Sequence, residues 1–178
     1  MFKPLSILLL LLCTTHLFAQ DNMLSFAYEG GMITHPGLSM GYHYQIGKHN
    51  GWVLQGGVKL GFYHHKGYQT AVFLTPVIQA QHISEKGFIW GLDLGGGPQR
   101  TYIPKAYKIG DAGSVSRDRS AGMMQWVFSP GIRFGKDLSE RRMVPLQWFI
   151  NPQLQFRKPN VGRIEKYFLL GAGVNYIL

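Results

Sequence analysis

The sequence has almost no cysteine: Cys13 is the only one among its 178 residues. It lies in an N-terminal segment that has Lys3, then an apolar run from Leu5 to Leu12, and later the small residue Ala19. A basic start, a short apolar run and a small residue before the cut are typical of a secretory signal peptide. We therefore expect cleavage after Ala19, which leaves residues 20–178 as a single domain that no disulfide can stabilise.

Long apolar runs are also scarce. The run in segment 1–19 is too short for a membrane-spanning helix, which needs about 20 apolar residues, and no later stretch comes near that length. Apolar residues at helical spacing are hard to find anywhere in the chain. These absences argue against a helical membrane protein. A lipoprotein attached through Cys13 is the alternative for this segment, but Leu12 is bulky where lipoprotein signals have a small residue.

What the chain does have is alternation of apolar and polar residues with a period of two. Near the C-terminus, for example, Trp148 and Phe156 share one face, whereas Gln147, Asn151 and Gln155 share the other. One face is nearly all apolar, and the other is glycine, amide and hydroxyl. This pattern predicts eight β-strands. They are expected near residues 24–30, 38–46, 52–62, 72–82, 88–97, 124–134, 144–156 and 168–178.

Alternation alone does not say whether the apolar face meets lipid or a protein core. The polar face is rich in glycine and amides rather than in the Lys and Glu of a water-facing sheet, and segments of about 9 to 13 residues can cross a bilayer as tilted strands. Aromatic residues gather at both segment ends, as expected at two membrane interfaces. One set is Trp52, Phe88, Trp90, Phe134, Trp148 and Tyr176; the other is Tyr28, Phe62, Tyr102, Trp126, Phe156 and Phe168.

These residues resemble the small eight-stranded outer-membrane β-barrels of Gram-negative bacteria, the OmpA- and OmpX-like transmembrane barrels. The resemblance covers residues 20–178 as a pattern rather than as residue identity. The final GAGVNYIL, with Gly173 and Tyr176, is similar to the signal by which the barrel-assembly machinery recognises such proteins; Leu178 stands where the family usually has Phe or Trp. The resemblance implies an all-β, eight-stranded, antiparallel up-and-down transmembrane barrel in the cell outer membrane.

Three predicted strands carry a proline in their middle: Pro76 in VFLTPVIQA, Pro130 in WVFSPGIRF and Pro152 in WFINPQLQF. All three fall on the outward, apolar face. Proline has no backbone N–H, so a neighbouring carbonyl loses its donor, and in hydrocarbon that loss is costly. We expect a β-bulge at each proline, which would bend the strand and help a small barrel to close.

Four charged residues fall on the inward face: Glu29, Lys59, Asp93 and Arg133. Asp93 and Arg133 belong to adjacent strands, and one strand, which carries His43, separates Glu29 from Lys59. Since side chains just fill an eight-stranded barrel, we predict two ion pairs that plug the lumen. Inward glutamines are expected to fill the rest: Gln55, Gln79, Gln125 and Gln153. A narrow channel for protons or solutes along these charges is an alternative.

Positive charge is in excess. Of 18 basic residues, 17 remain once Lys3 is removed, against 9 acidic ones. With the N-terminus in the periplasm, the longer connections face outside and carry ten basic against three acidic residues, a net of +7. We expect the basic residues to contact lipopolysaccharide phosphates. They are Lys66, Arg100, Lys105, Lys108, Arg117, Arg119, Arg157, Lys158, Arg163 and Lys166.

The third long connection, from Ile103 to Ala121, is predicted to be a mobile loop. We expect a non-enzymatic structural or accessory protein that contacts lipopolysaccharide or a larger envelope complex, and the barrel-assembly machinery during biogenesis. Nucleic acid is disfavoured as a partner, because the chain carries an export signal and no binding motif. No cofactor or metal is expected, because no CxxC, HExxH or phosphate-binding loop is present.

An enzyme that modifies lipid A, a deacylase or an acyltransferase, is the alternative function, since some barrels of this type have such activities. Hydrolysis of this kind needs a nucleophile, usually Ser, with a His and a carboxylate near it. The sequence has no deacylase-like His-x-Ser-Asn run. The local candidates are His64, His65, Asp111, Ser114, Ser116 and Asp118.

Overall fold

The structure of the protein, a computed structural model, describes residues 22–31, 36–103, 106–109, 114–118, 121–139, 144–159 and 163–178. The predicted signal peptide, residues 1–19, lies outside the described residues. Within these ranges no helix is long and apolar enough to cross a membrane.

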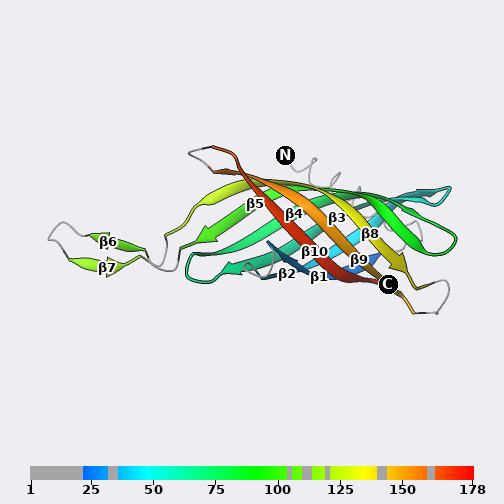
Figure 1. Cartoon of the computed structure of the whole chain (residues 1–178), viewed down its shortest axis with the longest axis horizontal. Coiled ribbons are helices and arrows are strands. Elements are labelled where there is room, and N and C mark those ends of the chain that lie inside the picture. Colours follow the sequence, from blue (N-terminus) through cyan, green and yellow to red (C-terminus); the bar gives the residue numbers. More distant parts are fainter. Residues whose placement is uncertain are drawn as a thin grey trace, which may run out of the picture.

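Eight antiparallel strands close into a barrel, as the sequence predicts. Each pairs with its neighbours along the chain, and pairing of the first strand with the last closes the wall (Figure 1). The strands are β1 (Met23–Gly30), β2 (Gly37–His49), β3 (Trp52–His65), β4 (Gln69–Ile83), β5 (Phe88–Tyr102), β8 (Met124–Asp137), β9 (Leu146–Pro159) and β10 (Glu165–Ile177).

Side chains alternate between the lumen and the outside along every strand of the barrel. In β5, Asp93 and Gln99 are buried inside the barrel, whereas Leu92 and Leu94 are exposed on its outer surface. The outer surface is apolar, with both predicted aromatic sets on it, and the inner surface is rich in glycine, amides and hydroxyls. A closed barrel with an apolar belt flanked by aromatic residues is suited to lipid rather than water.

Glycines on the inner surface make room for large side chains in the lumen. At Gly61 an added Cβ would lie 2.4 Å from Cζ of the Phe73 ring on the neighbouring strand. The strip of glycine on the polar face therefore has a packing role, since it lets aromatic and charged side chains occupy the narrow interior.

The two ends of the barrel carry different connections. At one end, here called the short-turn end, Asn50 and Gly51 join β2 to β3 with φ angles of 48° and 80°, as in a two-residue hairpin turn. The opposite end, here called the long-loop end, holds the β1–β2, β3–β4, β5–β8 and β9–β10 connections. Of these, the β3–β4 connection is only the three-residue turn 66–68.

The third long connection contains regular structure of its own. The sequence predicts a loop over Ile103–Ala121, but β6 (Tyr107–Ile109) and β7 (Val115–Arg117) pair there as a separate antiparallel sheet. This hairpin projects beyond the long-loop end of the barrel (Figure 1). Aromatic and β-branched residues within three-residue stretches favour these short strands.

The bulges predicted at the prolines are wrong. On either side of Pro76, β4 and β5 keep one register, because Phe73 faces Gln99 and Val77 faces Gly95. The pairing is interrupted between those two positions, so the missing N–H leaves a gap in the ladder rather than an inserted residue.

The β8–β9 seam behaves in the same way. Phe128 faces Phe156 and Gly131 faces Gln153, so the register is unchanged where Pro130 approaches the seam. Pairing resumes farther along in the same register on the far side of Pro152. Among the described strands a register shift occurs elsewhere, between Gln45 and Gly47 of β2.

Candidate functional site: the barrel lumen and its two ends

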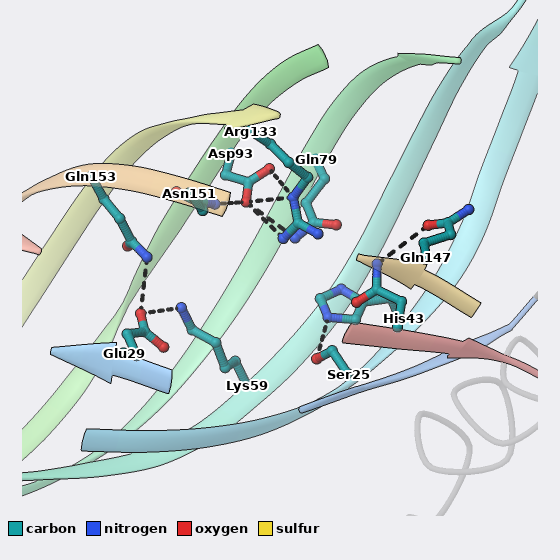
Figure 2. Close-up of polar contacts among 11 residues, drawn as sticks. Ser25, Glu29, His43, Lys59, Gln79, Asp93, Arg133, Gln147, Asn151 and Gln153 are labelled. Carbon is teal, nitrogen blue, oxygen red and sulfur yellow. Dashed lines mark hydrogen bonds and ion pairs between the residues drawn. The ribbon is translucent and has the colours of Figure 1, made fainter. Parts of the chain in front are cut away.

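The four inward charges form two ion pairs inside the barrel. Lys59 Nζ on β3 lies 2.5 Å from Glu29 Oε1 on β1, and both residues reach across β2, which stands between their strands. Gln153 Nε2 on β9 donates to the same Glu29 oxygen at 3.1 Å. In Figure 2 the Gln153 and Lys59 side chains reach the Glu29 carboxylate from different strands. The buried carboxylate thus has a cation and an amide to offset its desolvation.

The second pair is held more tightly. Arg133 on β8 donates to Asp93 on β5 through Nε at 3.1 Å and Nη2 at 2.9 Å, a two-pronged contact (Figure 2). Asn151 also donates to Asp93, as does Gln79 at 3.4 Å. The guanidinium lies 3.9 Å from the centre of the Phe149 ring. Both ions are buried, so each depends on the other for its stability in the lumen.

Little space remains around these pairs. The cavity between them has a volume of about 30 Å³, which is room for about one or two water molecules. His43 occupies the wall beside it, with Nε2 3.0 Å from the Ser25 hydroxyl (Figure 2). The space that the two ion pairs line is therefore small.

Arg157 lies inside the barrel toward the long-loop end. Its guanidinium lies 3.7 Å from the ring centre of Tyr167 and 5.0 Å from that of Tyr63, and its Nε donates to Gln155 Oε1 at 2.6 Å. Gln99 Nε2 donates to the Tyr63 hydroxyl at 3.0 Å. Arg157 is only 3% exposed. The assignment of Arg157 to the lipopolysaccharide contacts is therefore corrected: its charge lies inside the barrel, away from lipid head groups.

Three other basic residues face outward beside the aromatic set of the long-loop end. Arg100, Lys158 and Lys166 lie on the outward face of β5, β9 and β10. In register, Lys158 faces Trp126 and Lys166 faces Phe156. The three cations thus lie at the level where an aromatic girdle meets the head groups of a bilayer.

The remaining basic candidates are spread over the connections. Lys66, Lys108 and Arg163 are exposed, and Lys108 Nζ lies 3.2 Å from Asp118 Oδ2. Arg117 belongs to β7, whereas Lys105 and Arg119 lie outside the described residues.

The short-turn end opens into a cavity of about 410 Å³, here called the vestibule. Its apolar lining includes Met23, Val53 and Ile177. Its polar lining includes Lys48, Gln55, Glu85, Asp137, Ser139 and Gln147. This cavity could not be expected from the sequence, because the sizes and directions of side chains at strand ends depend on the turns that join them.

The catalytic candidates have other contacts. His64 Nδ1 lies 2.8 Å from the Thr70 hydroxyl, and Asp118 is paired with Lys108. The His65 ring packs against Tyr68. Ser114 and Ser116 belong to the projecting β6–β7 hairpin, and Asp111 lies outside the described residues. In the part of the chain that the structure describes, no three His, Cys, Asp or Glu residues are grouped to hold a metal ion.

Comparisons with known proteins show the fold. No protein-family model and no curated protein matches the sequence. Among solved structures, neisserial surface protein A aligns with a TM-score of 0.51 at 10% identity, over 89% of this chain and 96% of that one. The N-terminal barrel domain of Pseudomonas aeruginosa OprF aligns with a TM-score of 0.46 at 13% identity, over 89% of this chain and 97% of that one. Ail of Yersinia pestis aligns with a TM-score of 0.44 at 13% identity, over 89% of this chain and 99% of that one. With its closed eight-stranded wall and apolar outer belt, the chain has the fold of the small outer-membrane β-barrels.

Proposed function

We propose that this protein is a non-enzymatic accessory component of the outer membrane that holds lipopolysaccharide at its outer rim and conducts nothing through its lumen. The observation that carries the first part is the outward set Arg100, Lys158 and Lys166 beside the aromatic girdle. Cationic side chains at that level match the phosphates of anionic lipid head groups. The proposal takes the long-loop end as the extracellular one.

The plugged lumen is supported by the packing inside the barrel. The two ion pairs leave a cavity of about 30 Å³ between them, and the Arg157 guanidinium lies between two tyrosine rings nearer the long-loop end. A continuous water path would have to separate buried, oppositely charged groups from one another, which costs several kcal/mol. The same packing disfavours the narrow channel as a function.

Lipopolysaccharide binding to the purified barrel in phosphatidylcholine vesicles tests the rim. Removal of two cations with Lys158→Gln and Lys166→Gln should weaken binding about tenfold or more, since each basic residue near an anionic surface contributes about 1 kcal/mol. The matched control is Lys48→Gln with Lys86→Gln, which removes two exposed lysines at the other end. Equal affinity of the two double variants for lipopolysaccharide would refute the proposed contact.

The lipid A-modifying enzyme remains the rival, and one experiment separates it. Lipid A is extracted from cells with the protein, without it, and with His65→Ala, and its mass spectrum is recorded. We expect the same acyl pattern in all three. A change of acyl mass that requires the protein and disappears with His65→Ala would establish the enzyme instead.

A further inference from the structure

We propose that the vestibule at the short-turn end is a binding site for a small zwitterion, an amino acid or short peptide with a free amino group and a free carboxylate. The residues of this site differ from the basic residues of the outer rim. The site is supported by the shape of the cavity, by a re-aimed lysine, and by a carboxylate held in place by neutral donors.

The vestibule is much larger than the space at the centre of the barrel. It has a volume of about 410 Å³, whereas the space at the centre of the barrel has about 30 Å³. Gln55 and Gln147 line the vestibule, whereas His43, Asp93 and Arg133 line the space at the centre. A concave cavity of several hundred Å³ has the size of a small-molecule site.

Lys48 faces this cavity because of the register shift in β2. Gln45 faces Gln55 across the β2–β3 pair, but Lys48 faces Val53, so Ile46 is an extra residue in β2. Val53 is buried on the inner surface, and the shift therefore turns Lys48 inward, where it lines the vestibule. Without the extra residue, Lys48 would continue the outward face of the strand. β-Bulges often re-aim a side chain next to a functional site.

Asp137 lies on the opposite wall. In the order of strands around the barrel, β3, β4 and β5 separate β2 from β8 on one side, and β1, β10 and β9 on the other. Asp137 Oδ1 accepts from the Ser139 N–H at 2.8 Å and from the Ser139 hydroxyl at 2.6 Å, and Oδ2 accepts from Gln147 Nε2 at 2.8 Å. These three neutral donors fix the carboxylate.

The fixed carboxylate of Asp137 retains an unbalanced charge within the described part of the chain. Its partners there are neutral, and the ion pairs found within 4.0 Å join other residues. The neighbouring Lys136 extends over the Phe88 ring, with Nζ 5.2 Å from its centre. Glu85 lines the same cavity and adds a second negative charge. An ammonium group would complement this side of the vestibule.

The vestibule lining also contains a hydrogen-bond acceptor without a donor, on Gln55. Gln55 is 1% exposed, its Nε2 lies 3.9 Å from the Met23 sulfur, and its Oε1 has no hydrogen-bond partner among the described residues. A buried amide oxygen without a donor is destabilising, and a ligand N–H would supply the missing donor. The wall with Lys48 thus suits a ligand carboxylate, the wall with Asp137 suits a ligand amine, and Gln55 suits a peptide N–H. The class of molecule that carries all three groups is an amino acid or short peptide.

Calorimetric titration of the purified full barrel in detergent tests the site. The probes are trialanine, N-acetyl-trialanine, trialanine amide and alanine, and heat-modifiable gel mobility confirms that each protein variant is folded. We expect trialanine to bind, and each blocked probe to bind about tenfold more weakly, because each loses one charge-assisted contact. The comparison of alanine with trialanine shows which size of ligand the cavity prefers.

Variants assign the two walls. Lys48→Gln should weaken trialanine binding and abolish the discrimination against trialanine amide, and Glu85→Gln should reduce the discrimination against N-acetyl-trialanine. Both side chains are exposed, so neither variant should unfold the barrel. Lys86→Gln, in the same turn as Glu85, lies outside the vestibule lining and should change nothing. Absence of trialanine binding, or binding that neither the blocking groups nor Lys48→Gln affects, would overturn the proposal.

Discussion

The centre of the lumen and its short-turn end are built on the same strands with the same alternation, yet the cavity at the centre is about 30 Å³ and the cavity at the end about 410 Å³. At the centre, Asp93 and Arg133 form an ion pair and Phe149 packs on the guanidinium. At the short-turn end, Lys48 and Asp137 lie on opposite walls with space between them. The number of strands fixes the width of a small barrel. The pairing and size of the inward side chains decide how much of the space inside the barrel stays empty.

The largest expected effect comes from the filled centre. Arg133→Met should lower the free energy of unfolding by about 3–5 kcal/mol, because it leaves the Asp93 carboxylate buried without its cation. Urea unfolding of the barrel in lipid vesicles, followed by tryptophan fluorescence, measures it. A double variant that also carries Asp93→Asn no longer has an unpaired buried carboxylate. It should be more stable than Arg133→Met alone. A single variant as stable as the wild type would mean that the pair does not hold the centre together.

Lys59→Met should cost less, about 2 kcal/mol, even though it also breaks a lumenal ion pair. Glu29 keeps its hydrogen bond from Gln153, and the Lys59 side chain is 18% exposed, so part of the interaction is already screened. The same urea unfolding measures this difference. If Lys59→Met proved more damaging than Arg133→Met, the ranking of the two pairs by burial and number of hydrogen bonds would be wrong.

Arg157→Gln should have a smaller effect, about 1 kcal/mol, since what it loses is mainly the contact with the Tyr63 and Tyr167 rings. Lipopolysaccharide affinity of this variant should equal that of the wild type, because the residue lies inside the barrel. Unfolding in urea and the vesicle binding assay measure the two quantities. Weaker lipopolysaccharide binding by this variant would mean that Arg157 contacts lipopolysaccharide after all.

The smallest effect on stability is expected in the hollow end. Gln55→Leu should leave the free energy of unfolding nearly unchanged, since it replaces an amide with an unpaired oxygen by an apolar group of similar size. It should nevertheless weaken trialanine binding in the calorimeter, because the ligand N–H loses its acceptor. A large loss of stability would show that the Gln55 amide is a structural element rather than part of a site.

Most of the fold could be predicted from the sequence because a barrel wall imposes a strict period of two. The inward positions of Glu29, Lys59, Asp93 and Arg133 follow from counting along each strand, and neighbouring strands decide which of them can meet. Alternation along β9 also places Arg157 on the inward face. It was assigned to the outer rim because it lies near a loop, although its position in the alternation points inward. In a barrel wall, alternation along the strand therefore predicts the direction of a side chain better than its distance from a loop does.

The remaining features depend on details that alternation does not encode. The extra residue at Ile46 carries no glycine or proline signal of its own, although it decides where Lys48 points. At Pro76, the loss of an N–H can be met by a gap or by a bulge, and the sequence does not distinguish them. The vestibule arises from the directions of several strand ends, and these are set by turns whose geometry is fixed only in the folded chain.

Ion conductance of the purified wild-type barrel in planar bilayers tests the central claim most directly. A lumen filled by the Glu29–Lys59 and Asp93–Arg133 pairs and closed by Arg157 should give no steady current at any salt concentration or voltage that the bilayer tolerates. A steady conductance on the nanosiemens scale would contradict the account, because it requires a continuous water path where the structure has packed side chains.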